Sequence, residues 1–155
     1  MIEAVILVAL AAILIFVIVD DLRNFRIRNE AVAALAALFV LQTVLRGQYH
    51  EAALHAAFAA VMFAVVLLMY ARGHMGGGDV KLLVIAFLWL GIEKSFVFSL
   101  VLVGFAIAYA LLAKLGSVPK QMIASRTKVP FGPCIGAAWL VTAIPWGVSH
   151  LTMRP

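Results

Sequence analysis

The chain has 155 residues, of which 66% are hydrophobic and only 12% are charged, and its formal net charge is +5. Soluble domains hold about 45–50% apolar and about 25% charged residues, so this chain has too few charges to cover the surface of a soluble globule. Together with a mean hydropathy of +1.13, the composition excludes a disordered chain, a disulfide-stapled secreted module and a soluble enzyme, and it predicts an integral membrane protein.

Six apolar stretches follow one another along the chain. A helix that spans a bilayer needs about 20 mostly apolar residues. The stretches cover residues 2–19, 31–45, 52–71, 80–92, 95–115 and 131–150. The third is interrupted only by His55, and the fourth is short for a full span. We therefore expect an all-α bundle of about six transmembrane helices with short loops.

The first stretch has no basic segment before it and no small-residue cleavage site before its end at Val19. It therefore reads as a retained span and not as a signal peptide. The single cysteine, Cys134, excludes internal disulfides and a multi-cysteine zinc site.

The basic residues predict the orientation. Nine of the twelve lie in or beside the loops at 20–30, 72–81 and 116–130: Arg23, Arg26, Arg28, Arg72, Lys81, Lys114, Lys120, Arg126 and Lys128. Arg46, Lys94 and Arg154 lie on the other side. By the positive-inside rule the nine-charge side is cytoplasmic, which places both termini outside the cytoplasm. The same rule accounts for the net charge, so membrane lipid is an expected partner and nucleic acid is not.

Three acidic residues lie at cytoplasmic ends of the predicted spans. Asp20 and Asp21 end the first span, and Asp79 begins the fourth. A carboxylate at the edge of hydrocarbon is costly to ionise and therefore indicates function, although each of these could simply cap a helix or face water. Two carboxyl groups that share a low-dielectric site cannot both ionise easily. One can then act as a base on water while the other, protonated, polarises a carbonyl.

Gly76, Gly77 and Gly78 directly precede Asp79. Glycines permit positive φ and the close approach of another segment, and they disfavour helix, so Asp79 is expected at a junction between loop and helix. A phosphate-binding loop is rejected, because that motif needs GxxxxGK[ST] between a strand and a helix. Here an acid stands where the phosphate would lie.

Three segments resemble the prepilin peptidase family of intramembrane aspartyl proteases. GGGDVK at 76–81 resembles the GxGD motif, with the lysine typical of prepilin peptidases. DLRNFRIRN at 21–29 resembles the element in which an aspartate closes the first core helix and a basic stretch and Ile-Pro-Asn follow. VPFGP at 129–133 resembles the opening of the last helix. The three occur in the family's order and on the predicted cytoplasmic side, and the resemblance covers nearly the whole chain.

The resemblance implies an aspartate pair formed by Asp21 and Asp79. Asp20 remains an alternative to Asp21, because Arg28 stands where the family usually has proline, which loosens the register. Successive helical residues face different directions, so only one of the two is expected to face Asp79.

Gly76, Gly77 and Gly78 are expected to form an active-site loop. Lys81 and His74 lie close enough to Asp79 in sequence to be accessory residues, although Lys81 could instead be a positive-inside lysine and His74 a loop histidine at the headgroups. The resemblance implies no metal and no organic cofactor. His50, His55 and His150 lie on the other side from His74 in this topology, so no histidine metal cluster is expected.

Within the family the chain resembles the short type that serves tight-adherence (Flp) pili. A single transmembrane peptidase domain over residues 1–155 is expected, without the N-terminal zinc and methyltransferase region of the long type. The implied activity is removal of a short basic leader from a prepilin precursor, in the bacterial inner membrane and on its cytoplasmic side. The oligomeric state is not specified.

Two other functions stay open at this point. A proton-coupled transporter component also uses intramembrane acids, although it more often places charges at mid-bilayer in broken helices. A non-catalytic membrane scaffold for pilus assembly would need no aspartate pair.

Overall fold

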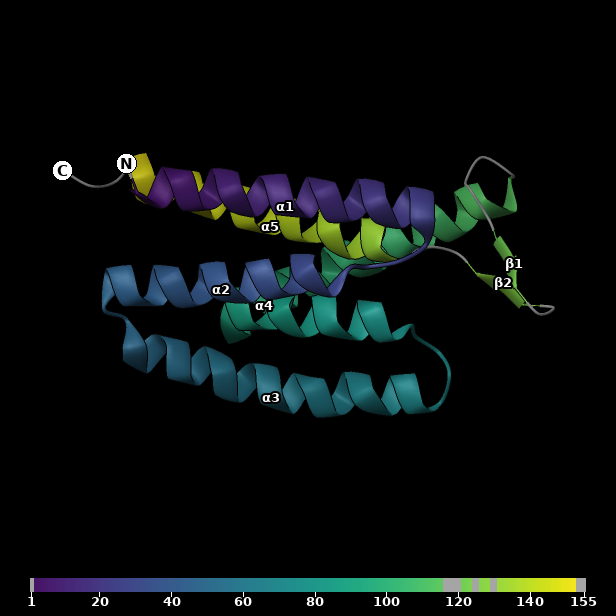
Figure 1. Cartoon of the computed structure of the whole chain (residues 1–155), viewed down its shortest axis with the longest axis horizontal. Coiled ribbons are helices and arrows are strands. Elements are labelled where there is room, and N and C mark those ends of the chain that lie inside the picture. Colours follow the sequence, from purple (N-terminus) through teal and green to yellow (C-terminus); the bar gives the residue numbers. More distant parts are fainter. Residues whose placement is uncertain (1, 116–120, 124–125, 129–130, 153–155) are drawn as a thin grey trace.

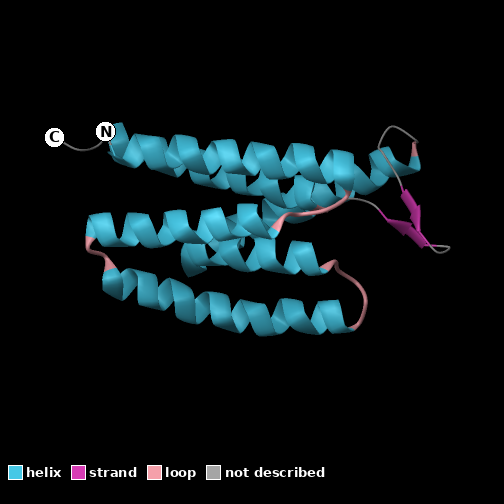
Figure 2. Cartoon of the chain, viewed as in Figure 1, coloured by secondary structure: helices cyan, strands magenta, loops and turns pink. Residues whose placement is uncertain are grey.

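The computed structural model describes residues 2–115, 121–123, 126–128 and 131–152. In chain order its elements are α1 (Ile2–Asn24), α2 (Asn29–Arg46), α3 (Tyr49–Ala71), α4 (Gly77–Lys114), β1 (Gln121–Ile123), β2 (Arg126–Lys128) and α5 (Gly132–Thr152). The helices run side by side along one axis, and the two short strands lie beyond one end of them (Figures 1 and 2). The strands pair antiparallel, with Met122 opposite Thr127, and they were not predicted from the sequence.

Four helices, α1 to α4, are long and apolar enough to cross a membrane. The part of α5 from Gly132 to Ala143 is also apolar. Large hydrophobic side chains such as Val8, Val61 and Leu100 point outward and are more than half exposed, as expected where the surrounding solvent is lipid. The chain is therefore a multi-pass membrane protein, which confirms the predicted helical membrane fold in its coarse form.

The predicted fourth and fifth spans both fall within α4, which consists of two helical segments joined at Gly91. Gly91 interrupts this element with φ 63° and ψ −172°. The rings of Phe87 and Phe98 lie 5.8 Å apart, whereas eleven residues of straight helix would separate them by about 16 Å. Thus α4 folds back on itself at Gly91. One glycine thus replaces the expected loop between these two spans. The described part of the chain has five continuous helical elements, and the count of six spans stays a prediction.

His55 satisfies a backbone carbonyl near this break. The last carbonyls of a helix have no partner within it. Leu88 O lies 3.0 Å from His55 Nδ1, and because a carbonyl can only accept, Nδ1 carries the proton. Trp89 Nε1 donates to Leu35 O at 3.0 Å. The one polar residue inside the third predicted span therefore binds backbone that the lipid could not satisfy.

Gly91→Ala is expected to lower the free energy of unfolding by at least about 2 kcal/mol. This backbone conformation is open essentially to glycine alone and costs other residues about 1–3 kcal/mol. A Cβ at Gly91 would also run into the His55 ring. Gly104→Ala is the matched control, because a Cβ there meets nothing within 4 Å. Thermal unfolding of both variants in the same detergent measures the difference, and equal stability would contradict a glycine-dependent break.

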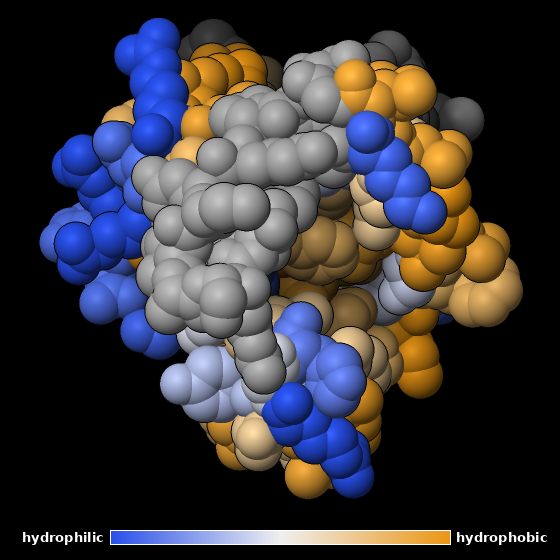
Figure 3. All heavy atoms as spheres, turned by 90° about the vertical axis from the view of Figure 1, so that its right-hand side faces the viewer, coloured by the Kyte–Doolittle hydropathy of each residue, from blue (hydrophilic) through white to orange (hydrophobic). Residues whose placement is uncertain are grey.

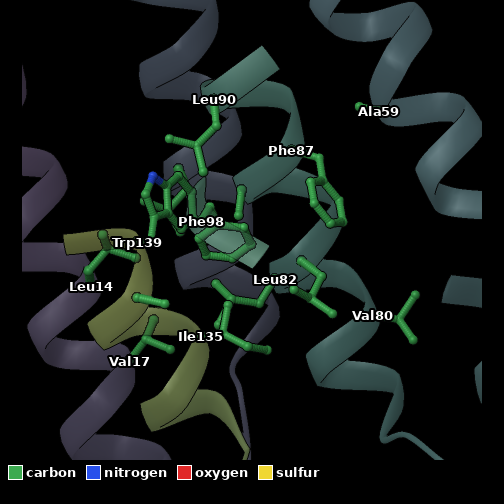
Figure 4. Packing of buried hydrophobic residues seen from close by; sticks show 14 of the residues in the cluster. Leu14, Val17, Ala59, Val80, Leu82, Phe87, Leu90, Phe98, Ile135 and Trp139 are labelled. Carbon is green, nitrogen blue, oxygen red and sulfur yellow. The ribbon is translucent and has the colours of Figure 1, made fainter. Parts of the chain in front are cut away.

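The core lies where α1, α4 and α5 meet (Figure 4). Leu14 from α1, Phe98 from α4 and Trp139 from α5 are fully buried. Because lipid is as apolar as these side chains, close packing holds such helices together. Gly136 of α5 packs so closely on α1 that a Cβ there would lie 2.6 Å from Ile18 Cγ1. This contact brings the end of α1 beside the start of α5.

The ends of the helices sort into two groups (Figure 1). One group lies at the right of the view and consists of the end of α1, the start of α2, the end of α3, both ends of α4 and the start of α5. The loops that carry most of the basic residues join elements at this end. Lys120, Val129, Pro130 and Arg154, on which part of the sequence analysis rested, lie outside the described residues.

Candidate active site

Asp21 lies in the last turn of α1 and is 4% exposed. Its Oδ2 accepts a hydrogen bond of 3.0 Å from the backbone N–H of Gly132, the first residue of α5. The first N–H groups of a helix have no acceptor within the helix, so Asp21 caps α5 from a different helix. Glycine is needed at 132, because a Cβ there would lie 2.6 Å from Asp21 Oδ2.

Asp79 is the third residue of α4, and it is partly buried. The expectation that the glycines lie outside the helix is wrong for two of them, because α4 begins at Gly77 and not at Val80. Nor does any of the three adopt positive φ. The N–H groups of a first helical turn make no hydrogen bonds within the helix. This turn therefore depends less on helix-forming residues and tolerates glycine. A close approach occurs within the chain at Gly78, where a Cβ would lie 3.1 Å from Ile27 Cβ.

Asp21 and Asp79 line one cavity of about 410 Å³ at the end of the bundle that carries the basic loops. Figure 3 looks onto this end, where hydrophilic side chains gather around the rim and apolar side chains cover the flanks. The other lining residues are Phe25, Arg26, Ile27, Asn29, Gly77, Gly78, Lys81 and Phe131. Segments from four helix ends thus bring two distant carboxylates to the same space.

Cys134 lies at the start of α5, close to this arrangement. Its thiol is buried in the first turn of α5 and is within electrostatic reach of both Asp79 and Asp21. Burial leaves such interactions poorly screened, so they extend over several ångströms. Both carboxylates therefore act on the same thiol.

Asp20 is placed differently from Asp21, although it is also buried. It accepts hydrogen bonds from Arg28 Nε at 3.0 Å and from Asn24 Nδ2 at 2.6 Å, and it does not line the cavity. The Arg28 guanidinium also lies 5.7 Å from the centre of the Phe16 ring. Arg28, where the sequence departs from the family pattern, thus pairs with Asp20, and neither residue lines the cavity.

The accessory residues divide between the cavity and the surface. Lys81 lines the cavity, and its Nζ donates to Asn29 Oδ1 at 2.9 Å. His74 is exposed in the loop before α4 and does not line the cavity. Gly77 and Gly78 line it, whereas Gly76 touches it only through Asp79, whose Oδ2 would lie 2.9 Å from a Cβ at Gly76.

Sequence reasoning gave no role to several residues of this site, among them two at the start of α5. Phe131 lines the cavity and Gly132 binds Asp21. Both belong to the VPFGP segment, which carried the resemblance but received no role. The sequence feature that could have identified Gly132 is a glycine next to a predicted helix start. Among the described residues, no group of three or more His, Cys, Asp or Glu side chains is placed to hold a metal ion.

The fold and the cavity define a multi-pass membrane protein with two buried or partly buried acids at one end of its helix bundle. A comparison with protein families identifies the family of this membrane protein. The type IV leader peptidase family matches residues 8–113, more than half of the chain, and the chain belongs to it. The match includes both Asp21 and Asp79. Neither the curated proteins nor the solved structures contain a match to the chain. Membership in the family makes this a leader-peptidase-like protease.

Proposed function

We propose that this protein is a membrane aspartyl endopeptidase that removes the short basic leader from Flp-type prepilin precursors. The observation that carries the proposal is the cavity shared by Asp21 and Asp79 in a member of the type IV leader peptidase family. The Flp-type substrate rests on the resemblance of the motifs to the short type. The inner membrane is the proposed location, with the cavity toward the cytoplasm, because the basic loops gather at that end.

The aspartate pair is proposed to share one proton. The ionised carboxylate takes a proton from a water molecule, whose oxygen attacks the carbonyl carbon of the scissile bond. The protonated partner donates a hydrogen bond to the carbonyl oxygen and stabilises the charge that develops there. When the C–N bond breaks, a proton from the pair goes to the leaving amine. The macroscopic titration then belongs to the pair and not to either aspartate alone.

The position of the cavity suits this chemistry. Hydrolysis needs water, and a site at the end of the bundle is reached by water while the rest of the chain lies in lipid. The close contact between Gly78 and Ile27 fixes the start of α4 against the segment after α1. That contact holds the backbone on which Asp79 stands, while Gly132 holds Asp21. Both carboxylates are thereby positioned before substrate binds.

The proposal is tested by mixing the purified protein in lipid vesicles with a purified Flp-type precursor. We expect a product shortened by its leader, with a single new N-terminus in mass spectrometry. EDTA should leave the rate unchanged, because the proposed reaction uses carboxylates alone. An intact precursor after prolonged incubation would overturn the proposed function. A rate that falls with EDTA and returns with a divalent metal would overturn the aspartyl mechanism.

A further inference from the structure

A second cavity lies between α4 and α5, next to the candidate active site. It has a volume of about 170 Å³, and its lining includes Phe105, Ala108 and Tyr109 from α4, and Cys134 and Ala137 from α5. Phe105 is partly open to the lipid-facing surface. We call this cavity the α4–α5 groove. A cavity of roughly 150 Å³ lined by apolar side chains can hold a benzene molecule, so the groove has room for one large apolar side chain.

Tyr109 places an unused polar group in this apolar groove. Its hydroxyl oxygen is buried and has no hydrogen-bond partner in the part of the chain that the structure describes. A buried hydroxyl without a partner is costly, and such groups are rare in native proteins. The hydroxyl is therefore available to donate a hydrogen bond to an acceptor on a molecule that occupies the groove.

The groove lies next to the candidate active site along the start of α5. Phe131 lines the first cavity, and Pro133 and Cys134 line the groove. Along α5, Gly132 binds Asp21, and the groove begins at the next residue, Pro133. A chain segment whose cleaved bond lies between Asp21 and Asp79 thus has the groove within reach of its neighbouring residues.

We propose that the α4–α5 groove binds one large apolar side chain of the precursor, close to the cleaved bond on its membrane side, and that the Tyr109 hydroxyl donates to a backbone carbonyl there. This subsite rests on the proposed function. A peptide bond must leave its helix to be cleaved, which frees carbonyls that need donors in an apolar site. A groove that opens toward lipid and carries one buried donor fits such a segment.

The test uses a set of precursors with either leucine or alanine at each of the first three residues after the cleaved bond. We expect the wild-type protein to prefer leucine at one of these positions by about tenfold in kcat/KM. Ala108→Leu fills the groove and should abolish that preference. Ala110→Leu is the matched control, because Ala110 is exposed on the same helix and does not line the groove. It should keep the preference.

Tyr109→Phe isolates the hydroxyl. It keeps the ring and removes a group that has no partner in the free protein, so stability should not fall. We expect KM to rise about fivefold with kcat unchanged, the effect of one neutral hydrogen bond to bound substrate. An unchanged KM would overturn the role of Tyr109.

The remaining outcomes separate this inference from the proposed function. If the wild type cleaves the precursors but shows no preference at any of the three positions, the subsite is wrong and the protease stands. The same holds if Ala108→Leu keeps the preference, as expected for a groove that a lipid acyl chain fills. If the wild type cleaves none of the precursors, both proposals fail.

Discussion

Asp79→Asn should abolish leader removal, lowering kcat/KM by at least about 10³-fold. The asparagine keeps the size of the side chain at the start of α4 but can neither take a proton from water nor share one with Asp21. Loss of a general acid or base typically costs about 10²–10⁴-fold, and here one side chain serves both steps. Initial rates of precursor cleavage, measured with wild type and variant in the same vesicles, give the ratio.

Asp21→Asn should lose a similar factor, and the double variant should be no slower than either single variant. Residues that act as one unit are grossly non-additive, because the first loss already removes the pathway. Asp20→Asn is the control on the same helix turn. It weakens only the contacts with Arg28 and Asn24, of which the ion pair is partly solvent-exposed, so a stability loss of at most about 1 kcal/mol is expected.

Three results would change the assignment. Full loss in Asp20→Asn with retained cleavage in Asp21→Asn would move the first aspartate by one residue. Retained cleavage in Asp79→Asn would overturn the aspartyl-protease proposal altogether. Loss in Asp20→Asn together with a collapse of the melting temperature would assign Asp20 a structural role, which the melting curves distinguish from catalysis.

Composition and charge pattern predicted the helical membrane fold, because hydrophobic length is a local property of the sequence. How the fourth and fifth stretches join depended instead on non-local contacts. Glu93 and Lys94 separate the fourth and fifth apolar stretches and suggested a loop. In the structure a single glycine makes the turn, and His55 from another helix packs against it. Nothing near Gly91 in the sequence identifies that partner.

The candidate site was likewise predicted only in part from the sequence. Asp21 and Asp79 were found because the family motif marks them, and the structure places both at one cavity. Neither segment alone shows how near the two carboxylates lie to one another. His74 was proposed because it is close to Asp79 in sequence, but the chain turns at Gly73, which has φ 74°, and His74 stays exposed. Proximity in sequence is a weak guide where a loop reverses direction.

The role of Gly132 as a positioning residue could not be predicted from its own segment of the sequence. A glycine at a helix start is ordinary, and its importance here comes from a carboxylate on another helix. Asp21 Oδ2 occupies the space where a side chain at 132 would begin. The glycine therefore serves Asp21 twice, by donating its N–H and by leaving room for the carboxylate.

Gly132→Ala is accordingly expected to lower kcat by about 10²-fold while the protein stays folded. The new Cβ would lie 2.6 Å from Asp21 Oδ2 and 3.1 Å from Ile27 Cδ1, so the carboxylate must move away from its present place. A displacement of about 1 Å in a reacting group can cost about 10²-fold in rate. Single-turnover cleavage, which measures the chemical step apart from precursor binding, is the appropriate readout.

Gly136→Ala is the control that separates carboxylate displacement from helix spacing. It lies one turn along α5 and would push against Ile18 of α1 at 2.6 Å, without touching a carboxylate. Both variants strain the same pair of helices, so both should lower the melting temperature, but only Gly132→Ala should slow the chemical step at temperatures where both are folded. Equal slowing in the two variants would mean that the spacing of α1 and α5, and not the room left for Asp21, limits the reaction.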